Sequence, residues 1–279
     1  MKRFVLGVTA AGALAAQTVG GPVLGYVVDG AARLHAVYGM PAAAHIGDAV
    51  REGVRETAGE LALGADGRAW RNGMELEGRW ARLEPGALLD ASGREALVAA
   101  GDRAAWRLML PARALAVRVS ADGARVLTLL EDETLALWNA DGKAEFRVSA
   151  GAWWRIAFAG ERAVAYDPAE HALIAFDGQG ASTTLRKLEG AGGRYELAAT
   201  RSGAQLVLLG EGTLTVVPAG GGELRSMAAP EGAERLEPLR GGEAFLLGRD
   251  PARPLWILDP GKEQALVVIP ALAEKGGQQ

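Results

Sequence analysis

Residue types that build many functional sites are absent or rare in this chain. The 279 residues include no cysteine, three histidines and two asparagines. Without cysteine, disulfides, thiolate zinc sites, iron–sulfur clusters and cysteine nucleophiles are all excluded. The net charge is −4, which lacks the basic excess of nucleic-acid-binding proteins. We therefore expect no nucleic-acid partner.

The sequence also offers no recognisable catalytic motif. His35, His45 and His171 have no histidine or acidic partner at metal-ligand spacing, so we interpret them as core or surface residues. The acidic run Glu131–Glu133 is typical of a solvated turn rather than a cation loop. There is no Gly-x-Ser-x-Gly elbow, His-Glu-x-x-His helix or dinucleotide fingerprint. We expect a protein that is not an enzyme and that has no metal or cofactor.

The N-terminus has the features of a secretory signal peptide. Lys2 and Arg3 precede an apolar run from Phe4 to Leu14, and small residues follow it. We predict a signal peptide over residues 1–16, cleaved after Ala15 or Ala16. The run is shorter than the roughly 20 residues that span a bilayer, and no cysteine follows it for lipid attachment. A periplasmic or secreted product, not inserted in the membrane, is the expectation.

What the chain does contain is one short phrase repeated four times. A leucine-led apolar strand followed closely by a turn glycine begins at Leu135, Leu173, Leu214 and Leu255, at intervals of 38, 41 and 41 residues. A spacing of about 40 residues is the period of a β-propeller blade. The expected fold class is therefore all-β, a propeller of four-stranded antiparallel blades.

The segment from Leu115 to Val148 shows the complete unit. Alternating apolar residues predict a first strand up to Val119, the turn Ser120–Gly123 follows, and three more strands are expected at 125–130, 134–138 and 143–148. The same order fits three later segments, 153–188, 194–227 and 235–269.

Upstream of Leu115 the units are shorter. Two weaker sets of strands are expected over 59–80 and 86–110, while Leu24–Asp29 and Arg33–Tyr38 resemble the third and fourth strands of a blade. This count favours seven blades, with six as the alternative. We predict a single propeller domain over residues 21–271 and a polar tail over 272–279.

One blade carries a family resemblance. The phrase from Val119 to Val126, followed by Leu135-Ala-Leu-Trp138, resembles a blade of the WD-repeat or YVTN type. The segment Gly21–Asp29 is similar to the opening of uncharacterised exported bacterial propellers. Both resemblances imply fold and location but no activity, since propellers have many functions.

The best contact candidates are Trp153, Trp154 and Arg155. Adjacent strand residues face opposite sides, so one tryptophan should enter a blade interface and the other should be exposed or face the tunnel. We expect a monomeric, exported binding module for an envelope protein, peptide or glycan. The alternatives are an enzyme or cofactor-binding propeller with a tunnel site assembled from several blades, and a scaffold subunit of an envelope assembly complex.

Overall fold

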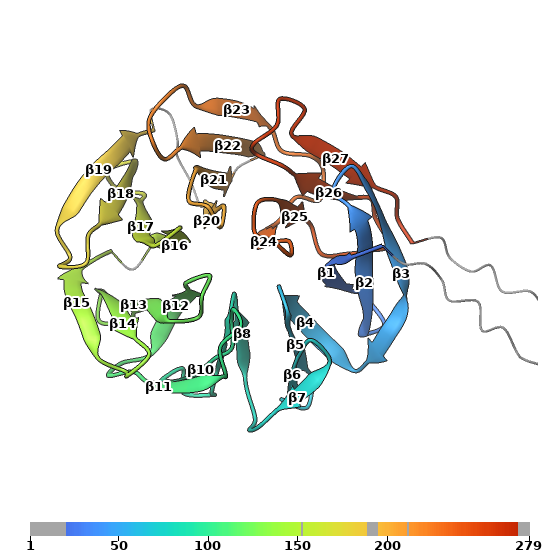
Figure 1. Ribbon diagram of the computed structural model, residues 1–279, viewed down its shortest axis with the longest axis horizontal. Helices are drawn as coiled ribbons and strands as arrows, with labels where there is room; N and C mark the ends of the chain where they lie inside the picture. The colour runs from blue at the N-terminus through green and yellow to red at the C-terminus, as the bar shows by residue number, and fades with distance from the viewer. Residues whose placement is uncertain (1–20, 152, 189–194, 211, 273–279) are drawn as a thin grey trace, which may run out of the picture.

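The chain folds into a ring of β-sheets. The computed structural model describes residues 21–151, 153–188, 195–210 and 212–272. These residues form 27 strands in seven antiparallel sheets, which surround a central tunnel (Figure 1). The protein is therefore a seven-bladed β-propeller, as the repeat spacing predicts, and the six-blade alternative is wrong. Within these ranges no helix has the length and apolar character to cross a membrane.

The blades are numbered 1 to 7 in chain order. Blade 1 contains β1 (Val23–Val28), β2 (Arg33–Met40) and β3 (Ala43–Glu52). Blade 2 contains β4 (Val54–Ala58), β5 (Leu61–Gly64), β6 (Ala69–Arg71) and β7 (Met74–Leu76). Blade 3 contains β8 (Arg82–Glu84), β9 (Ala87–Leu89), β10 (Glu95–Val98) and β11 (Trp106–Met109). Blade 4 contains β12 (Ala114–Val119), β13 (Arg125–Leu130), β14 (Thr134–Asn139) and β15 (Ala144–Ser149).

The last three blades repeat this plan. Blade 5 contains β16 (Arg155–Ala159), β17 (Arg162–Asp167), β18 (Ala172–Phe176) and β19 (Ser182–Lys187). Blade 6 contains β20 (Glu196–Ala199), β21 (Gln205–Gly210), β22 (Thr213–Pro218) and β23 (Arg225–Ala228). Blade 7 contains β24 (Leu236–Pro238), β25 (Phe245–Leu247), β26 (Leu255–Leu258) and β27 (Leu266–Ile269). In every blade the strands pair in sequence order, and the first strand lies nearest the tunnel (Figure 1).

Apolar side chains hold neighbouring blades together. The described residues form seven buried clusters, and each cluster joins two adjacent blades. On β14, Leu135 and Leu137 face blade 5, whereas Ala136 and Trp138 face blade 3. Successive side chains of a strand point to opposite faces of its sheet. The repeated leucine-led phrase therefore packs two interfaces at once.

Blade 1 differs from the other six because it has three strands. The chain direction shows which strand is absent. Near the start of β1, Leu24 O accepts a hydrogen bond from Arg240 N, just beyond the end of β24, at 2.7 Å. Beyond the end of β1, Ala32 O accepts one from Val54 N, at the start of β4, at 3.0 Å. β1 therefore runs opposite to the innermost strands on both sides of it.

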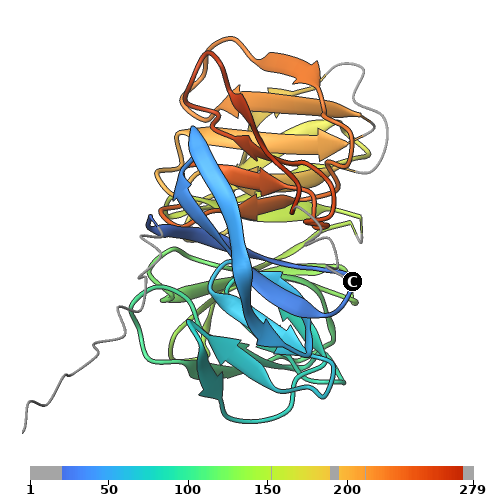
Figure 2. The same ribbon diagram turned by 90° about the vertical axis from the view of Figure 1, so that its right-hand side faces the viewer.

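The three strands of blade 1 consequently run in the directions of the second, third and fourth strands of a complete blade. The prediction that Leu24–Asp29 and Arg33–Tyr38 are third and fourth strands is wrong by one place, because β3 follows them. Blade 1 has no strand in the innermost direction, so β1 borders the tunnel. Figure 2 views the ring from this side, with the long β3 crossing the front.

We call the rim at which the innermost strands of blades 2 to 7 end rim A, and the opposite rim B. The turn of blade 1 at rim B is held by one carboxylate. Asp29 Oδ1 accepts hydrogen bonds from Ala31 N and Arg33 N, at 3.0 and 2.9 Å. Its Oδ2 lies 2.7 Å from Arg33 Nε and 3.2 Å from His35 Nε2. Burial alone would raise the pKa of Asp29, but these hydrogen bonds outweigh burial and lower this pKa to about 2.

We expect Asp29→Asn to lower the unfolding free energy at neutral pH by about 1–3 kcal/mol, because hydrogen bonds to a charged group are lost. The carboxylate stabilises the fold fully above its unfolded pKa of 3.8, and this stabilisation is lost as the pH falls toward 2. The difference between wild type and variant should therefore shrink between about pH 4 and pH 2. Thermal unfolding followed across this range measures it. Asp141→Asn, in an exposed turn, is the control, and an equal effect there would contradict the role of Asp29.

Candidate functional site

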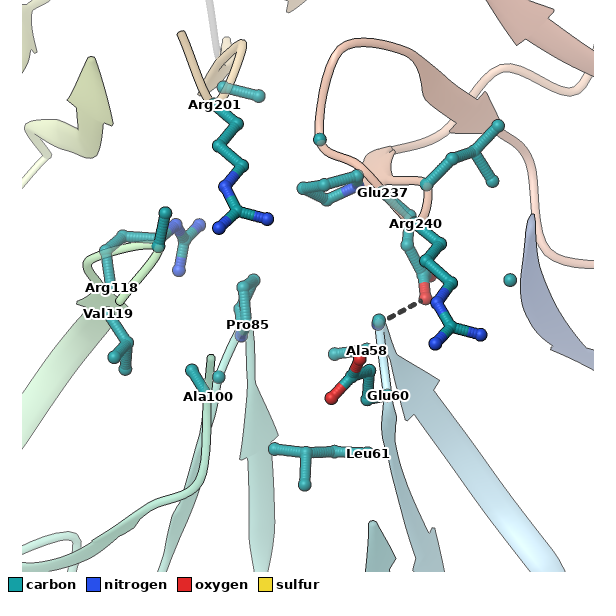
Figure 3. A pocket seen from close by; sticks show the side chains of 18 of the residues that line it. Ala58, Glu60, Leu61, Pro85, Ala100, Arg118, Val119, Arg201, Glu237 and Arg240 are labelled. Carbon is teal, nitrogen blue, oxygen red and sulfur yellow. Dashed lines mark hydrogen bonds between the residues drawn. The ribbon is translucent and has the colours of Figure 1, made fainter. Parts of the chain in front are cut away.

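The tunnel contains the main cavity of the protein. Its volume is about 610 Å³, and it is lined by residues of all seven blades. This volume lies within the range of about 300–1,000 Å³ that is usual for ligand sites. Figure 3 shows side chains from several blades extending into it. The innermost strands and the turns that follow them therefore build a single central site.

The cavity is lined by charged side chains of both signs. The arginines that line it are Arg118, Arg201, Arg235, Arg240 and Arg249. The acidic residues that line it are Glu56, Glu60, Glu84, Asp102, Glu196 and Glu237. The blade interfaces behind the lining are apolar. The charged side chains of the tunnel therefore stand in front of an apolar wall.

Most of the tunnel carboxylates already bind a neighbour. Glu84 Oε2 accepts a hydrogen bond from Arg118 Nη1 at 2.8 Å. Glu60 Oε2 lies 3.1 Å from Asn72 Nδ2 and 3.4 Å from Arg71 Nε. Two others are also bound: Glu56 to Arg55 at 2.8 Å, and Glu196 to Leu236 N at 2.6 Å. These contacts fix the acidic groups on the protein itself.

A buried ion pair joins blade 7 to blade 2. Arg235 contacts Glu237, and both side chains belong to blade 7. Arg235 Nη2 donates to Thr57 O at 2.8 Å, and Glu237 Oε1 accepts from Gly59 N at 2.9 Å. Thr57 is part of β4 in blade 2, and Gly59 directly follows that strand. These bonds therefore connect blade 7 to blade 2 without involving blade 1, which lies between them in the ring. We call Arg235 and Glu237 the brace. They connect blade 7 to the innermost strand of blade 2, because blade 1, between them, has no innermost strand of its own.

The brace is deeply buried and surrounded by more positive charge. The exposed fractions of the Arg235 and Glu237 side chains are 14% and 7%. Burial, together with the nearby Arg249 and Arg118, lowers the pKa of Arg235 to about 10, although Glu196 and Glu56 act in the opposite direction. At neutral pH the guanidinium is protonated and stays paired with Glu237.

Two arginines at rim A occupy equivalent positions on neighbouring blades. Arg201 and Arg240 are each the second residue of the turn after the innermost strand, where Ala121 stands in blade 4. The two turns are joined, because Arg201 N donates to Gly242 O at 2.8 Å. Ser202 N and Oγ also bind the carboxylate of Glu243, at 2.8 and 2.9 Å.

Gly242 makes this close approach possible. Its φ is +73°, and a Cβ atom at this position would lie 2.7 Å from the Cβ of Arg201. A side chain there would meet both backbone strain and a collision. Glycine therefore brings the turns of blades 6 and 7 together and fixes the base of Arg201.

The side chains of Arg201, Arg240 and Arg249 make no hydrogen bond or ion pair with any described residue. Figure 3 shows Arg201 extending into the tunnel opening from the turn of blade 6, and Arg240 extending from the turn of blade 7 beside Glu237. The half-buried Tyr26 lies within electrostatic reach of Arg240. Burial raises the pKa of Tyr26, whereas the charge of Arg240 lowers it. This side of rim A therefore presents positive charge that the described carboxylates do not neutralise.

A smaller cavity of about 180 Å³ opens between blades 1 and 2. Tyr26, Glu60 and Asn72 border both this cavity and the tunnel. Trp70 also lines it, with the guanidinium of Arg51 placed 4.6 Å above the ring. The tunnel thus has an aromatic side pocket beside blade 1.

The sequence-predicted contact residues lie outside both cavities. Trp153 and Trp154 belong to the connection between blades 4 and 5, because β16 begins at Arg155 rather than earlier. Trp154 packs into the interface between these blades, with its ring 6.2 Å from that of Phe176, whereas Trp153 is 64% exposed. Arg155 donates to the carbonyls of Trp153 and Trp154. The prediction that one of the two tryptophans enters a blade interface is confirmed. The contact role of Trp153, Trp154 and Arg155 stays a prediction.

The three histidines are scattered, and none lines the tunnel. His35 is buried between Asp29 and Gly47, His45 stacks on Tyr38 at 5.8 Å, and His171 lies in the turn between β17 and β18. Among the residues that the structure describes, no three histidine, aspartate or glutamate side chains group as a metal site.

Sequence reasoning missed the arginines of the tunnel. One signal could have found two of them. Superimposing the first turns of the repeats, Ser120–Gly123, Thr200–Gly203 and Leu239–Gly242, puts arginine at one position in blades 6 and 7 and alanine in blade 4. The brace gives no such signal, because its partners in blade 2 are backbone atoms.

The fold and its tunnel site define the class as a seven-bladed β-propeller. No protein-family model matches the chain, and the search of curated proteins found no match. The chain is similar in structure to virginiamycin B lyase from Staphylococcus aureus, at 10% identity and a TM-score of 0.51, over 90% of this chain and 85% of that one. A streptogramin B lyase matches at 8% identity and a TM-score of 0.49, over 91% and 85%. Hsv2 from Kluyveromyces lactis matches at 10% and 0.47, over 87% and 74%. The similarity to virginiamycin B lyase shows the propeller fold alone.

We expect Arg235→Ala to lower the unfolding free energy by about 3–5 kcal/mol, because it leaves the carboxylate of Glu237 buried without its cation. Replacing both partners, in Arg235→Met with Glu237→Leu, should cost less than the single change. Urea unfolding measures both differences. The control is Arg68→Ala, which removes an exposed pair with Asp66 and should cost less than about 1 kcal/mol. A similar loss in Arg68→Ala and Arg235→Ala would rule out the brace.

Proposed function

We propose that this protein is an exported, non-enzymatic propeller that binds a protein, peptide or glycan of the cell envelope in its central tunnel. The observation that carries the proposal is the cavity of about 610 Å³, to which all seven blades contribute. A cavity with a few converging polar groups is the usual form of a ligand site. The propeller supplies a rigid ring, and the ligand-binding groups lie on its inner strands and turns.

The state of the tunnel carboxylates supports binding over catalysis. A general acid or base needs a carboxyl group that can reach a substrate proton. Glu60, Glu84 and Glu237 instead hold protein groups. An enzyme with a tunnel site is the competing function, and it predicts turnover that binding alone does not produce. A scaffold role in an envelope complex is the third, and it predicts contacts on a rim rather than in the tunnel.

We also propose export and a relationship to propellers of the WD-repeat or YVTN type. Export is supported by the composition of residues 1–16, which lie outside the described residues. The relationship is supported by the sequence of blade 4, where Trp138 Nε1 donates to Thr128 Oγ1 at 2.8 Å inside the sheet. The predicted tail over 272–279 lies outside the described residues except for Leu272.

Narrowing the tunnel mouth should abolish ligand capture. Ala121 is exposed and lines the cavity at rim A, so we expect Ala121→Trp to reduce capture from an envelope extract by at least about tenfold. Immobilised protein and quantitative mass spectrometry of the bound material measure this. The control is Thr183→Trp, on the exposed outer strand β19 of blade 5, which should capture the ligand normally.

Two further results would argue against tunnel binding. Loss of capture in Trp153→Ala, with normal capture in Ala121→Trp, would place the contact on the loop between blades 4 and 5. Release of a chemically altered ligand by the wild type, but not by Ala121→Trp, would favour the enzyme.

Removing residues 1–16 should keep the protein in the cytoplasm. The full-length chain should appear in the periplasm or the medium, without its first 15 or 16 residues, because the apolar run directs secretion. Cell fractionation with N-terminal sequencing tests this. A full-length chain that stays in the cytoplasm with an intact N-terminus would refute export.

A further inference from the structure

The positive side of rim A indicates the chemistry of the ligand. Arg201 and Arg240 line the tunnel cavity from adjacent turns (Figure 3), and neither side chain has a partner among the described residues. A guanidinium group without a carboxylate partner is favourably placed when an anion binds it. Guanidinium groups also match carboxylate and phosphate oxygens in geometry.

The carboxylates of Glu243, Glu237 and Glu60 already bind protein groups, and Asp102 is the one cavity-lining carboxylate that makes no hydrogen bond or ion pair with a described residue. Glu243 binds the backbone and hydroxyl of Ser202, and Glu237 belongs to the brace. Glu60 lies close enough to influence Tyr26, but its carboxylate is held by Asn72 and Arg71. The two arginines therefore keep their charge available for a ligand.

The backbone below the arginines is fixed in advance. The hydrogen bond from Arg201 N to Gly242 O joins the two turns, and the missing side chain of Gly242 allows their close contact. A ligand that binds here does not have to order these turns, which reduces the entropic cost of binding. Arg118, on blade 4, is by contrast paired with Glu84.

We propose that Arg201 and Arg240 form an anion clamp at rim A, in which each arginine binds a carboxylate or phosphate group of the ligand that enters the tunnel. This inference rests on the proposed function, since it names the chemistry recognised at the same site. Tyr26 also lines the tunnel.

The test uses probes of known charge. A fluorescein-labelled hexaglutamate peptide should bind the full chain at low ionic strength, and its hexaglutamine analogue should not. Arg201→Gln and Arg240→Gln should each weaken hexaglutamate binding about tenfold, because each removes a charge-assisted hydrogen bond. Fluorescence anisotropy measures these affinities. Competition by glutarate and by inorganic phosphate separates the two sources of the anion.

The control removes the same charge elsewhere. Arg113→Gln, before β12 at rim B, combined with Arg186→Gln, on β19, changes net charge as much as the double clamp variant and should leave binding unchanged. Circular dichroism verifies that every variant folds. Equal loss in the control, or equal binding of hexaglutamine, would overturn the clamp.

The two proposals fail separately. Envelope-ligand capture that Ala121→Trp abolishes, but the double clamp variant leaves intact, would overturn the clamp and keep tunnel binding. Clamp-dependent binding of hexaglutamate, without capture of any envelope ligand, would overturn the proposed function and keep the clamp.

Discussion

The ion pair between Arg235 and Glu237 ties the ring together at the place where its two ends meet. A propeller closes when its last blade packs against its first, yet blade 1 has no strand in the innermost direction. One backbone hydrogen bond and an apolar cluster connect blades 7 and 1. The brace adds two bonds from blade 7 to the backbone of blade 2. Polar side chains thus connect the two innermost strands that flank blade 1.

The same arrangement shapes the tunnel. Because β1 is the second strand of its blade by direction, the side pocket with Trp70 and Arg51 opens beside the tunnel, between blades 1 and 2. The brace uses the carboxylate of Glu237, while Arg201 and Arg240 stay unpaired in the described structure. The asymmetry of the ring therefore produces an uneven distribution of charge, with free positive groups on blades 6 and 7. In a ring of identical blades, the charges would be distributed evenly around the tunnel.

The sequence predicts the fold well because strand and turn signals are local. Periodic leucines and turn glycines identify blades 4 to 7, and the strands of blade 4 match their expected bounds within one residue. The direction of β1 could not be predicted, because strand propensity is the same for both directions. The site was missed for a related reason. Arg201 and Arg240 are 39 residues apart in sequence, and their turns become neighbours only when the blades lie side by side. Trp153 was predicted as a contact residue from its residue type alone.

The three-stranded blade has a consequence for motion. Since Arg235 and Glu237 connect blades 7 and 2 directly, blade 1 packs outside that connection, held mainly by the apolar contacts of Val37, Leu24 and Leu34 with its two neighbours. Local unfolding separates parts of a structure that share few bonds with the rest. We therefore expect the amide hydrogens of blade 1 to exchange before those of blades 2 to 7, which the brace joins directly.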